Sequence, residues 1–470
     1  MWVFSLRMIN RVLGLVRTIV LARLLAPEDF GLLGIAMLSV STVETFSQTG
    51  FQAAIVQKKE NVASYLDTAW TASALRGLIL FLLLFLFAPF IAKFFNSPQA
   101  TLVIKVIAIS ILFDGFSNIG IILFQKDLDF KRQFYFEFTA TVVNLSVSIS
   151  LAIILRNIWA LVAGGIAANL VRLVMSYIIH PYRPKIAINQ DKLKEMFVFG
   201  RWIFISSIIL FLCTHGDDIY VGKLFGIAAL GIYQMAYNLS NLATTEISHL
   251  ISRVTFPAYS KLQNEIPRLR EAFLRVLKIT AFFAFPISGC ILLFSSEFTR
   301  IFLGEKWLEI VPILNILVIA AAFRSIAATT GPVIRGVGNP KIDTFWQITR
   351  LIFLAAFIYP FSAFWGIKGP AIAVLISILA PTFGLLVDVK KIIMCNHIKF
   401  LNTILLPMLN TIIMVLIILL IKKLYLTIFI IDFFILIISS LLLYIAVAVI
   451  FEFSLNYGLR RIIRENLKLL

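Results

Sequence analysis

Residues 77–92 read GLILFLLLFLFAPFIA and lie between Arg76 and Lys93 without an intervening charge. A transmembrane helix needs roughly 20 mostly apolar residues, and this run with its flanks supplies a span near residues 68–95. The strands of an outer-membrane barrel alternate apolar and polar residues over ~10 positions. The run is continuous instead, so it predicts a transmembrane α-helix and excludes a barrel strand.

Similar runs recur along the whole chain of 470 residues, of which 60% are hydrophobic and 14% charged. Soluble domains have about 45–50% apolar and about 25% charged residues, so a soluble domain is excluded. We predict an all-α polytopic membrane protein with about 14 transmembrane helices. The predicted spans lie near residues 2–25, 31–55, 68–95, 101–125, 135–155, 158–180, 198–222, 229–256, 272–295, 309–334, 344–365, 367–388, 399–421 and 427–451.

The orientation follows from the basic residues of the connections, which number 21 at one set of ends and 8 at the other. The positive-inside rule makes the richer side cytoplasmic. Both termini and residues 181–197 are then cytoplasmic, and residues 296–308 are extracytoplasmic. Most of the net charge of +18 is explained in this way, so no nucleic-acid partner is needed. Arg17 and Arg23 interrupt the first apolar stretch and no cleavage motif follows it, so it is not predicted to be a removable signal peptide.

An internal repeat is visible at an offset of 200 residues, where Trp2 matches Trp202 and Gly31 matches Gly231. Further identities link residues 4, 9, 19, 24 and 36 to 204, 209, 219, 224 and 236, and an offset of 210 pairs 113 with 323 and 131 with 341. Six spans per copy return the second copy to the same orientation, which predicts parallel repeats. We therefore expect a six-helix lobe at 1–196, a second at 197–395, and two additional helices with a basic cytoplasmic tail at 396–470.

Cysteine and histidine are too few and too scattered to indicate redox or metal chemistry. Cys213, Cys290 and Cys395 form neither a disulfide framework nor a C-x-x-C motif. The four histidines lack the spacing of zinc ligands. No cofactor and no metal site are predicted.

The first predicted helix carries a polar face. Residues 7, 10, 11, 14, 17 and 18 recur at spacings of three and four, so Arg7, Asn10, Arg11 and Arg17 share one side of the helix. Arg7 by itself is also compatible with snorkelling to the cytoplasmic surface. A charge in a span costs about 2.5–3.5 kcal/mol on insertion scales and usually faces a cavity. The face therefore predicts a cationic wall for an anionic solute.

The second copy of the repeat has carboxylates where the first has an arginine and a threonine. Asp217 and Asp218 correspond to Arg17 and Thr18, and Asp218 shares a face with Ser207 and Thr214. Adjacent carboxylates in a span favour coupling to a proton or another cation. The alternatives are that they lie in water at the outer mouth or pair with a neighbouring arginine.

The eighth predicted helix bears a second polar stripe. Its members are Asn238, Asn241, Thr245, Glu246, His249, Ser252 and Arg253. The stripe predicts a cavity lining, to which Asn10 also belongs, or interhelical hydrogen bonding. Isolated charges in other spans are individually weak indicators; they are Glu44, Arg76, Lys105, Asp114, Glu137, Arg172, Arg324 and Arg350.

Residues 21–31 read LARLLAPEDFG. Together with a tryptophan near the start of the first helix and the Gly-x-Tyr at 231–233, this stretch resembles the polysaccharide-biosynthesis flippases. These are the oligosaccharide-lipid exporters of the multidrug/oligosaccharidyl-lipid/polysaccharide superfamily. The resemblance covers the whole chain and is greatest to the branch that exports colanic or teichuronic acid type units. Relatives commonly have a short extension before this point, so the true start could lie upstream of Met1.

The resemblance implies two lobes that alternate access to a central cationic cavity. The implied substrate is an undecaprenyl-diphosphate-linked oligosaccharide, moved across the inner membrane for O-antigen, capsule or exopolysaccharide assembly. Arg7, Arg11 and Arg17 would then bind the diphosphate, since arginine offers paired donors. A coupling cation, H⁺ or Na⁺, and the pathway's polymerase and glycosyltransferases are the implied partners.

Two other functions remain open at this point. A multidrug exporter of the same superfamily would usually have twelve spans and prefer organic cations. An integral-membrane glycosyltransferase would need acidic residues on a sizeable outer loop, and the outer acids such as Glu28, Asp29 and Glu305 form no metal cluster. We therefore expect a transporter and not an enzyme.

Overall fold

The computed structural model describes residues 2–47, 63–127, 129–241, 255–423 and 430–455. Side chains are described for these residues except at 2–7, 63, 64, 125, 130, 190–206, 454 and 455. The described residues form helices and connecting turns, with no strand among them. Ten of the helices are long and apolar enough to cross a membrane. The prediction of an all-α polytopic membrane protein is confirmed.

Each of the fourteen predicted spans contains a described helix, although the ends differ in places. The predicted 101–125 span is broken: α5 (Ala100–Phe116) stops, and a 3₁₀ turn at Ile119–Ile121 and the short α6 (Ile122–Lys126) follow. The break arises because the Asn118 side chain accepts from the Gly120 amide at 2.9 Å and so caps the new turn. By contrast α9 (Gln190–Phe225) starts ahead of the predicted position 198, with polar residues that hydropathy alone excludes from a span.

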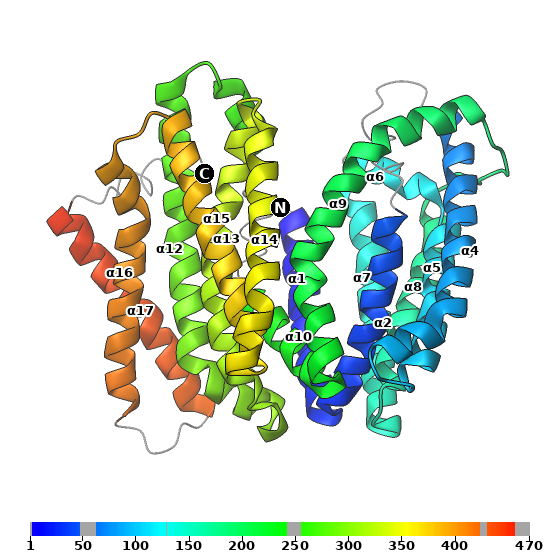
Figure 1. Ribbon diagram of the computed structural model, residues 1–470, viewed down its shortest axis with the longest axis horizontal. Helices are drawn as coiled ribbons and strands as arrows, with labels where there is room; N and C mark the ends of the chain where they lie inside the picture. Colours follow the sequence, from blue (N-terminus) through cyan, green and yellow to red (C-terminus); the bar gives the residue numbers. More distant parts are fainter. Residues whose placement is uncertain (1, 48–62, 128, 242–254, 424–429, 456–470) are drawn as a thin grey trace. The chain divides into compact units, whose positions relative to one another are not determined.

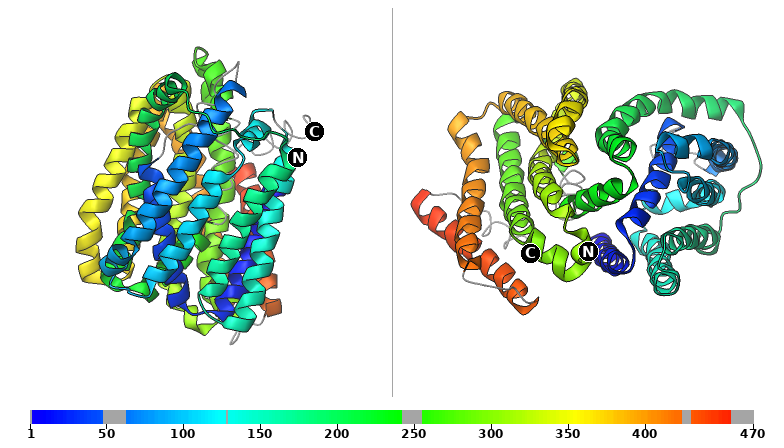
Figure 2. Two further views of the ribbon diagram at one scale, coloured as in Figure 1. Left: turned by 90° about the vertical axis from the view of Figure 1, so that its right-hand side faces the viewer. Right: turned by 60° about the horizontal axis from the view of Figure 1, so that its bottom comes forward.

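The described chain forms two compact units. Unit 1 comprises Met1–Gln234 and Phe302–Lys306, and unit 2 comprises Met235–Ile301 and Trp307–Leu470. Within each unit the helices run side by side (Figures 1 and 2).

Unit 1 is built on two helix pairs. In one, α4 (Ala63–Phe94) packs against α5, and Gly77 and Gly115 let the backbones approach: a Cβ on either would lie 3.0 Å from the other's Cα. In the other, α7 (Phe130–Leu155) packs against α8 (Trp159–Ile179), while α5 also contacts α8. Small residues at the contact are the usual means of tight packing between membrane helices.

Two further helices of unit 1 carry candidate site residues. Helix α1 (Trp2–Leu24) packs along α7, where Leu21 and Leu25 are buried against Ala152 and Leu161. Helix α2 (Pro27–Phe46) begins at a proline, which suits the first turn, and packs against α5 and α9. The short connection between α1 and α2 therefore holds them as neighbours.

Helix α2 also crosses the start of α10 (Ile227–Asn241) at very close range. A Cβ on Gly31 would overlap the carbonyl of Ile227, and a Cβ on Gly231 would overlap the carbonyl of Pro27. At the repeat offset of 200, position 27 corresponds to position 227, and Gly31 corresponds to Gly231. The crossing is therefore reciprocal: the glycine of each helix faces a backbone carbonyl of the other helix, at corresponding positions of the proposed repeat.

The connection between α8 and α9 is anchored to α4. The Tyr182 hydroxyl and the Lys185 amide both donate to Asp67, and the Ala187 amide donates to the Thr71 hydroxyl at 3.1 Å. Burial, and then the neighbouring Asp67 carboxylate, raise the pKa of Tyr182, so its hydroxyl stays protonated as the donor. This segment is thus an ordered strap.

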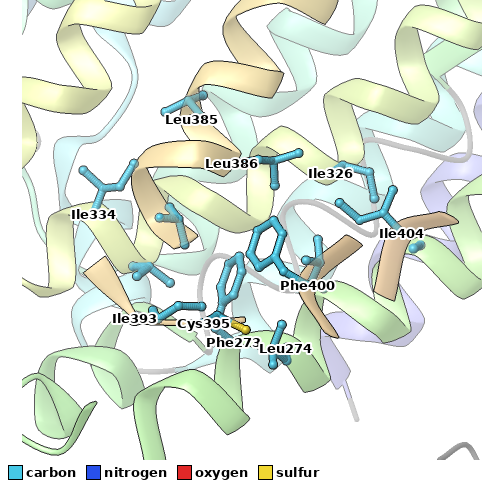
Figure 3. Packing of buried hydrophobic residues seen from close by; sticks show 14 of the residues in the cluster. Phe273, Leu274, Ile326, Ile334, Leu385, Leu386, Ile393, Cys395, Phe400 and Ile404 are labelled. Carbon is cyan, nitrogen blue, oxygen red and sulfur yellow. The ribbon is translucent and has the colours of Figure 1, made fainter. Parts of the chain in front are cut away.

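Unit 2 has an apolar core between α12 (Ile266–Phe298), α13 (Ile310–Gly336), α15 (Lys368–Ile392) and α16 (His397–Lys422). Figure 3 shows Phe273 and Phe400 facing one another near Ile326 and Leu386; the Phe273 and Phe400 rings are stacked with centroids 6.3 Å apart. Helix α14 (Pro340–Trp365) packs on α15, and α17 (Ile430–Leu455) packs on α16. This core fixes the position of α13, the helix that carries the charged residue Arg324.

Candidate functional site

The arginine face of α1 contains a cation with one shielded donor that lacks an acceptor in the described structure. Arg17 is half-buried, and its Nε is shielded from solvent with no hydrogen-bond acceptor among the described residues. Asn10, two turns away, has a shielded Oδ1 that likewise meets no donor in the described part of the chain. A Cβ on Gly14, between them, would meet nothing within 4 Å. The face therefore presents open space flanked by two unsatisfied polar groups.

The other predicted members of this face differ. Arg11 is exposed, and the side chain of Arg7 lies outside the described part. The Thr18 hydroxyl donates to the Gly14 carbonyl at 2.9 Å, so it is satisfied within its own helix. Of the two predicted arginines whose side chains the structure describes, Arg17 is the more enclosed and Arg11 the more exposed.

Two other intramembrane arginines of unit 1 have several polar partners each. Arg76 donates from Nε to the Ser47 carbonyl at 2.9 Å and from Nη2 to the Glu44 carbonyl at 3.1 Å, which holds the end of α2. Arg172 lies 3.6 Å from the Glu137 carboxylate and donates to Asn169 at 2.9 Å. We interpret both as structural arginines, because Arg76 binds the end of α2 and Arg172 pairs with Glu137 of α7. Arg17 does not share this pattern.

The carboxylates of α9 are buried within the protein. Asp217 is 1% exposed and accepts from the Tyr233 hydroxyl at 2.7 Å. Asp218 is 8% exposed, with Oδ2 lying 3.6 Å from Nδ1 of His215. Its Oδ1 is shielded and has no donor among the described residues. The alternative that these carboxylates lie in water is wrong.

The surroundings of Asp218 come from three helices. His215 lies against Phe211, with ring centroids 5.2 Å apart, and Phe211 lies against Phe46 of α2. Gln234 of α10 also hydrogen-bonds to Asp218 and occupies the space over Gly34 of α2. Thr214 is predicted to share the face of Asp218, but its hydroxyl donates to the Leu210 carbonyl at 2.7 Å. The Asp218 carboxylate is thus surrounded by the neutral Gln234 side chain and one histidine, His215.

The polar stripe of the eighth predicted helix is described only in part. Thr245, His249 and Arg253 lie outside the described residues, and Asn238 is exposed. Asn241 is 9% exposed, and its Oδ1 accepts from Arg324 Nη1 of α13 at 2.7 Å. The same nitrogen donates to the Tyr237 hydroxyl at 3.0 Å. Sequence reasoning did not connect Arg324 with Asn241, because nothing in their spacing shows that α10 and α13 meet there.

Unit 1 thus brings Arg17 and Asn10 together on α1 and Asp217 and Asp218 together on α9, and unit 2 joins Asn241 to Arg324. In the described ranges, no three His, Cys, Asp or Glu side chains gather where a metal ion could bind. Cys213, Cys290 and Cys395, all in the described ranges, form no disulfide with one another.

The fold and these intramembrane charges define a multi-pass α-helical membrane protein whose spans contain cationic and anionic centres. Residues 20–312 match the polysaccharide biosynthesis protein family, so the chain belongs to that family. The expectation from the LARLLAPEDFG stretch is confirmed.

Two curated relatives and one solved structure are similar over long ranges. The chain is 24% identical to the lipopolysaccharide biosynthesis protein WzxC of Escherichia coli (strain K12), over 84% of this chain and 81% of that protein. It is 27% identical to the teichuronic acid biosynthesis protein TuaB of Bacillus subtilis (strain 168), over 63% and 62% of the two chains. The inward closed conformation of the lipid II flippase MurJ superposes with a TM-score of 0.77 at 19% identity, covering 96% of this chain and 98% of that one.

Proposed function

We propose that this protein is a flippase that moves undecaprenyl-diphosphate-linked oligosaccharide repeat units across the inner membrane by alternating access. Its role is then surface polysaccharide assembly, and it is a transporter and not an enzyme. Membership of the polysaccharide biosynthesis family and the similarity to WzxC, TuaB and the MurJ fold support this function.

The observation that carries the proposal is the shielded Nε of Arg17, which meets no acceptor among the described residues. A buried donor without an acceptor costs about 1–3 kcal/mol, and the charge adds about 2.5–3.5 kcal/mol in a span. A diphosphate offsets both, because it supplies charge and several acceptors at once. Arg17, with Arg11 beside it and Arg7 nearer the cytoplasmic end, receives the diphosphate, and Asn10 faces the same space.

Two finer parts of the proposal concern energy coupling and orientation. Asp217 and Asp218 bind the coupling cation, H⁺ or Na⁺, since Asp218 keeps a shielded oxygen without a donor in the described structure. Both termini are cytoplasmic, as the basic connections require. Asn238, Asn241, Thr245, His249 and Arg253 line the substrate path, and glycosyltransferases and a polymerase of the pathway deliver and consume the substrate.

The test replaces Arg17 and Arg11 singly by glutamine in the full-length protein. Both variants should reach the membrane, and Arg17→Gln should melt as the wild type does, because no carboxylate of the described structure pairs with Arg17. Each should lose surface-polysaccharide export and bind geranylgeranyl diphosphate about tenfold or more weakly, as expected for a lost charge-assisted hydrogen bond. Arg17→Lys should recover only part of the binding, because a point charge lacks the paired donors.

Two other arginines serve as controls. Arg132→Gln removes an exposed partner of Asp129 and should change neither export nor melting. Arg172→Gln leaves Glu137 without its cation and should lower the melting temperature. Full export by an Arg11→Gln, Arg17→Gln double variant contradicts the proposed function of this face.

A further inference from the structure

The guanidinium of Arg324 is hydrogen-bonded at one end, and the donors at its other end meet no acceptor in the described ranges. Its Nη1 donates to both the Tyr237 hydroxyl and Asn241 Oδ1, at 3.0 and 2.7 Å. The Tyr237 ring lies under the same group, with the guanidinium carbon 5.1 Å from the ring centroid. Three contacts from one helix therefore fix the orientation of a single side chain on α13.

The opposite edge of this guanidinium lacks an acceptor in the part of the chain that the structure describes. Nε and Nη2 are both shielded from solvent, and neither meets an acceptor among the described residues. These two nitrogens lie on the same side of the planar group, and their N–H bonds point in nearly the same direction. That edge is the one that receives both oxygens of a carboxylate or phosphate.

In Arg76 the same Nε and Nη2 edge forms hydrogen bonds within the protein. There Nε donates to the Ser47 carbonyl at 2.9 Å, and Nη2 donates to the Glu44 carbonyl at 3.1 Å and to the Ser47 hydroxyl at 2.8 Å. An arginine retained only to join α10 to α13 would gain by filling this edge in the same way. In Arg324 the edge that could form two parallel hydrogen bonds has no acceptor among the described residues.

We propose that Arg324 binds an oxyanion of the transported substrate through Nε and Nη2, with Tyr237 and Asn241 as positioning residues. The inference rests on the proposed function and extends it by placing an oxyanion-binding site wholly within unit 2. The shielding of both nitrogens means that side chains around the edge move aside when the ligand enters. The oxyanion is either the diphosphate of the lipid carrier or the carboxylate of an acidic sugar.

The charge balance favours an anion over a neutral sugar. No carboxylate of the described structure forms an ion pair with Arg324, and its two held contacts are neutral oxygens. A neutral hydroxyl group would satisfy one donor and leave the charge uncompensated in the span. An oxyanion satisfies both donors and the charge together.

The experiment measures binding of geranylgeranyl diphosphate and of a glucuronate-containing oligosaccharide to purified full-length protein, with geranylgeraniol as the probe without a phosphate. Arg324→Lys keeps the charge but loses the two-pronged edge, and Arg324→Gln loses both. We expect affinity for one anionic probe to fall about tenfold or more in both variants. Binding of geranylgeraniol should stay unchanged. Loss with the diphosphate identifies the lipid carrier, and loss with the glucuronate probe identifies the sugar.

Two companion variants separate binding from folding. Tyr237→Phe keeps the ring but removes the hydroxyl, so it should weaken the same probe less than Arg324→Gln does. Arg335→Lys lies on the same helix beside Asp343, with its side chain 52% exposed, and should bind both probes as the wild type does.

Unchanged affinity for both anionic probes in Arg324→Lys and Arg324→Gln, with Arg17→Gln still defective, overturns this inference and leaves the proposed function standing. A lower melting temperature of the Arg324 variants without a loss of affinity would also overturn the inference. If the wild type itself binds neither anionic probe, the proposed function fails, and this inference fails with it.

Discussion

At the scale of single residues, intramembrane arginines differ by what surrounds them and not by where they occur in the sequence. Arg76 binds the end of α2 and Arg172 pairs with Glu137 of α7, whereas Arg17 and Arg324 have shielded donors without an acceptor in the described structure. Both kinds appear in the sequence as a charge within an apolar run. Only the partner atoms separate a structural arginine from a candidate for binding.

Asp218 is the residue for which the structure sharpens a prediction of ion coupling. Its Oδ1 is shielded and meets no donor in the described structure, and its other contacts are His215 and Gln234, so the carboxylate is a candidate to hold a proton or a cation. Asp218→Asn should still bind geranylgeranyl diphosphate, because it lies on a different helix from Arg17. Transport should lose its dependence on the ion gradient, because an amide cannot take up a proton or carry the negative charge that holds a cation.

The measurement is substrate flipping in proteoliposomes with and without an imposed H⁺ or Na⁺ gradient. Asp388→Asn is the matched control, since Asp388 accepts from Trp346 Nε1 at 2.8 Å on two helices of unit 2. That variant should remain gradient-dependent. Gradient dependence retained by Asp218→Asn would return this carboxylate to a structural role.

At the scale of elements, the reciprocal crossing of α2 and α10 is the contact most sensitive to side-chain size. Gly31 and Gly231 each face a carbonyl of the other helix, and a carbonyl cannot rotate aside as a side chain can. Their shared offset from Pro27 and Ile227 supports the proposed duplication with lobes at 1–196 and 197–395. A side chain at either position would overlap that carbonyl, so the proposed duplication predicts glycine at both.

Gly31→Ala and Gly231→Ala should each destabilise the protein by about 1–3 kcal/mol, the usual effect of overpacking. Gly165→Ala on α8 is the control, because its Cβ would meet nothing within 4 Å. Alanine is also the better helix former by about 0.8–1.0 kcal/mol, so the control should melt no lower than the wild type. Thermal unfolding of the purified variants measures both effects, and wild-type melting of Gly31→Ala would contradict the close approach.

At the scale of the whole molecule, the prediction concerns orientation in the membrane. In a variant lacking Cys213, Cys290 and Cys395, single cysteines at Ile186 and Arg300 test the two sides. Ile186 is 85% exposed, and Arg300 is exposed as well, so both positions are reachable by a thiol reagent. Residue 186 should react only from the cytoplasm and residue 300 only from outside. Cytoplasmic labelling of residue 300 by an impermeant reagent would overturn the orientation.

The sequence by itself determined the class of protein and the approximate place of each helix. Long apolar runs leave one solution in a bilayer, because every backbone donor and acceptor must be satisfied within the segment itself. The LARLLAPEDFG stretch also identified the family. Boundaries were less accurate where a local polar contact decided them, as at Asn118 after α5 and along the polar start of α9.

The tertiary structure alone decided which polar groups have partners. Arg324 and Asn241 are 83 residues apart, Arg76 and Ser47 are 29 apart, and no periodicity within one helix predicts either contact. Helical spacing places side chains on a face, but it does not say which other helix that face meets. Hydrogen-bond satisfaction is a property of two packed surfaces, so the empty edge of Arg324 became visible only when α10 and α13 were placed together.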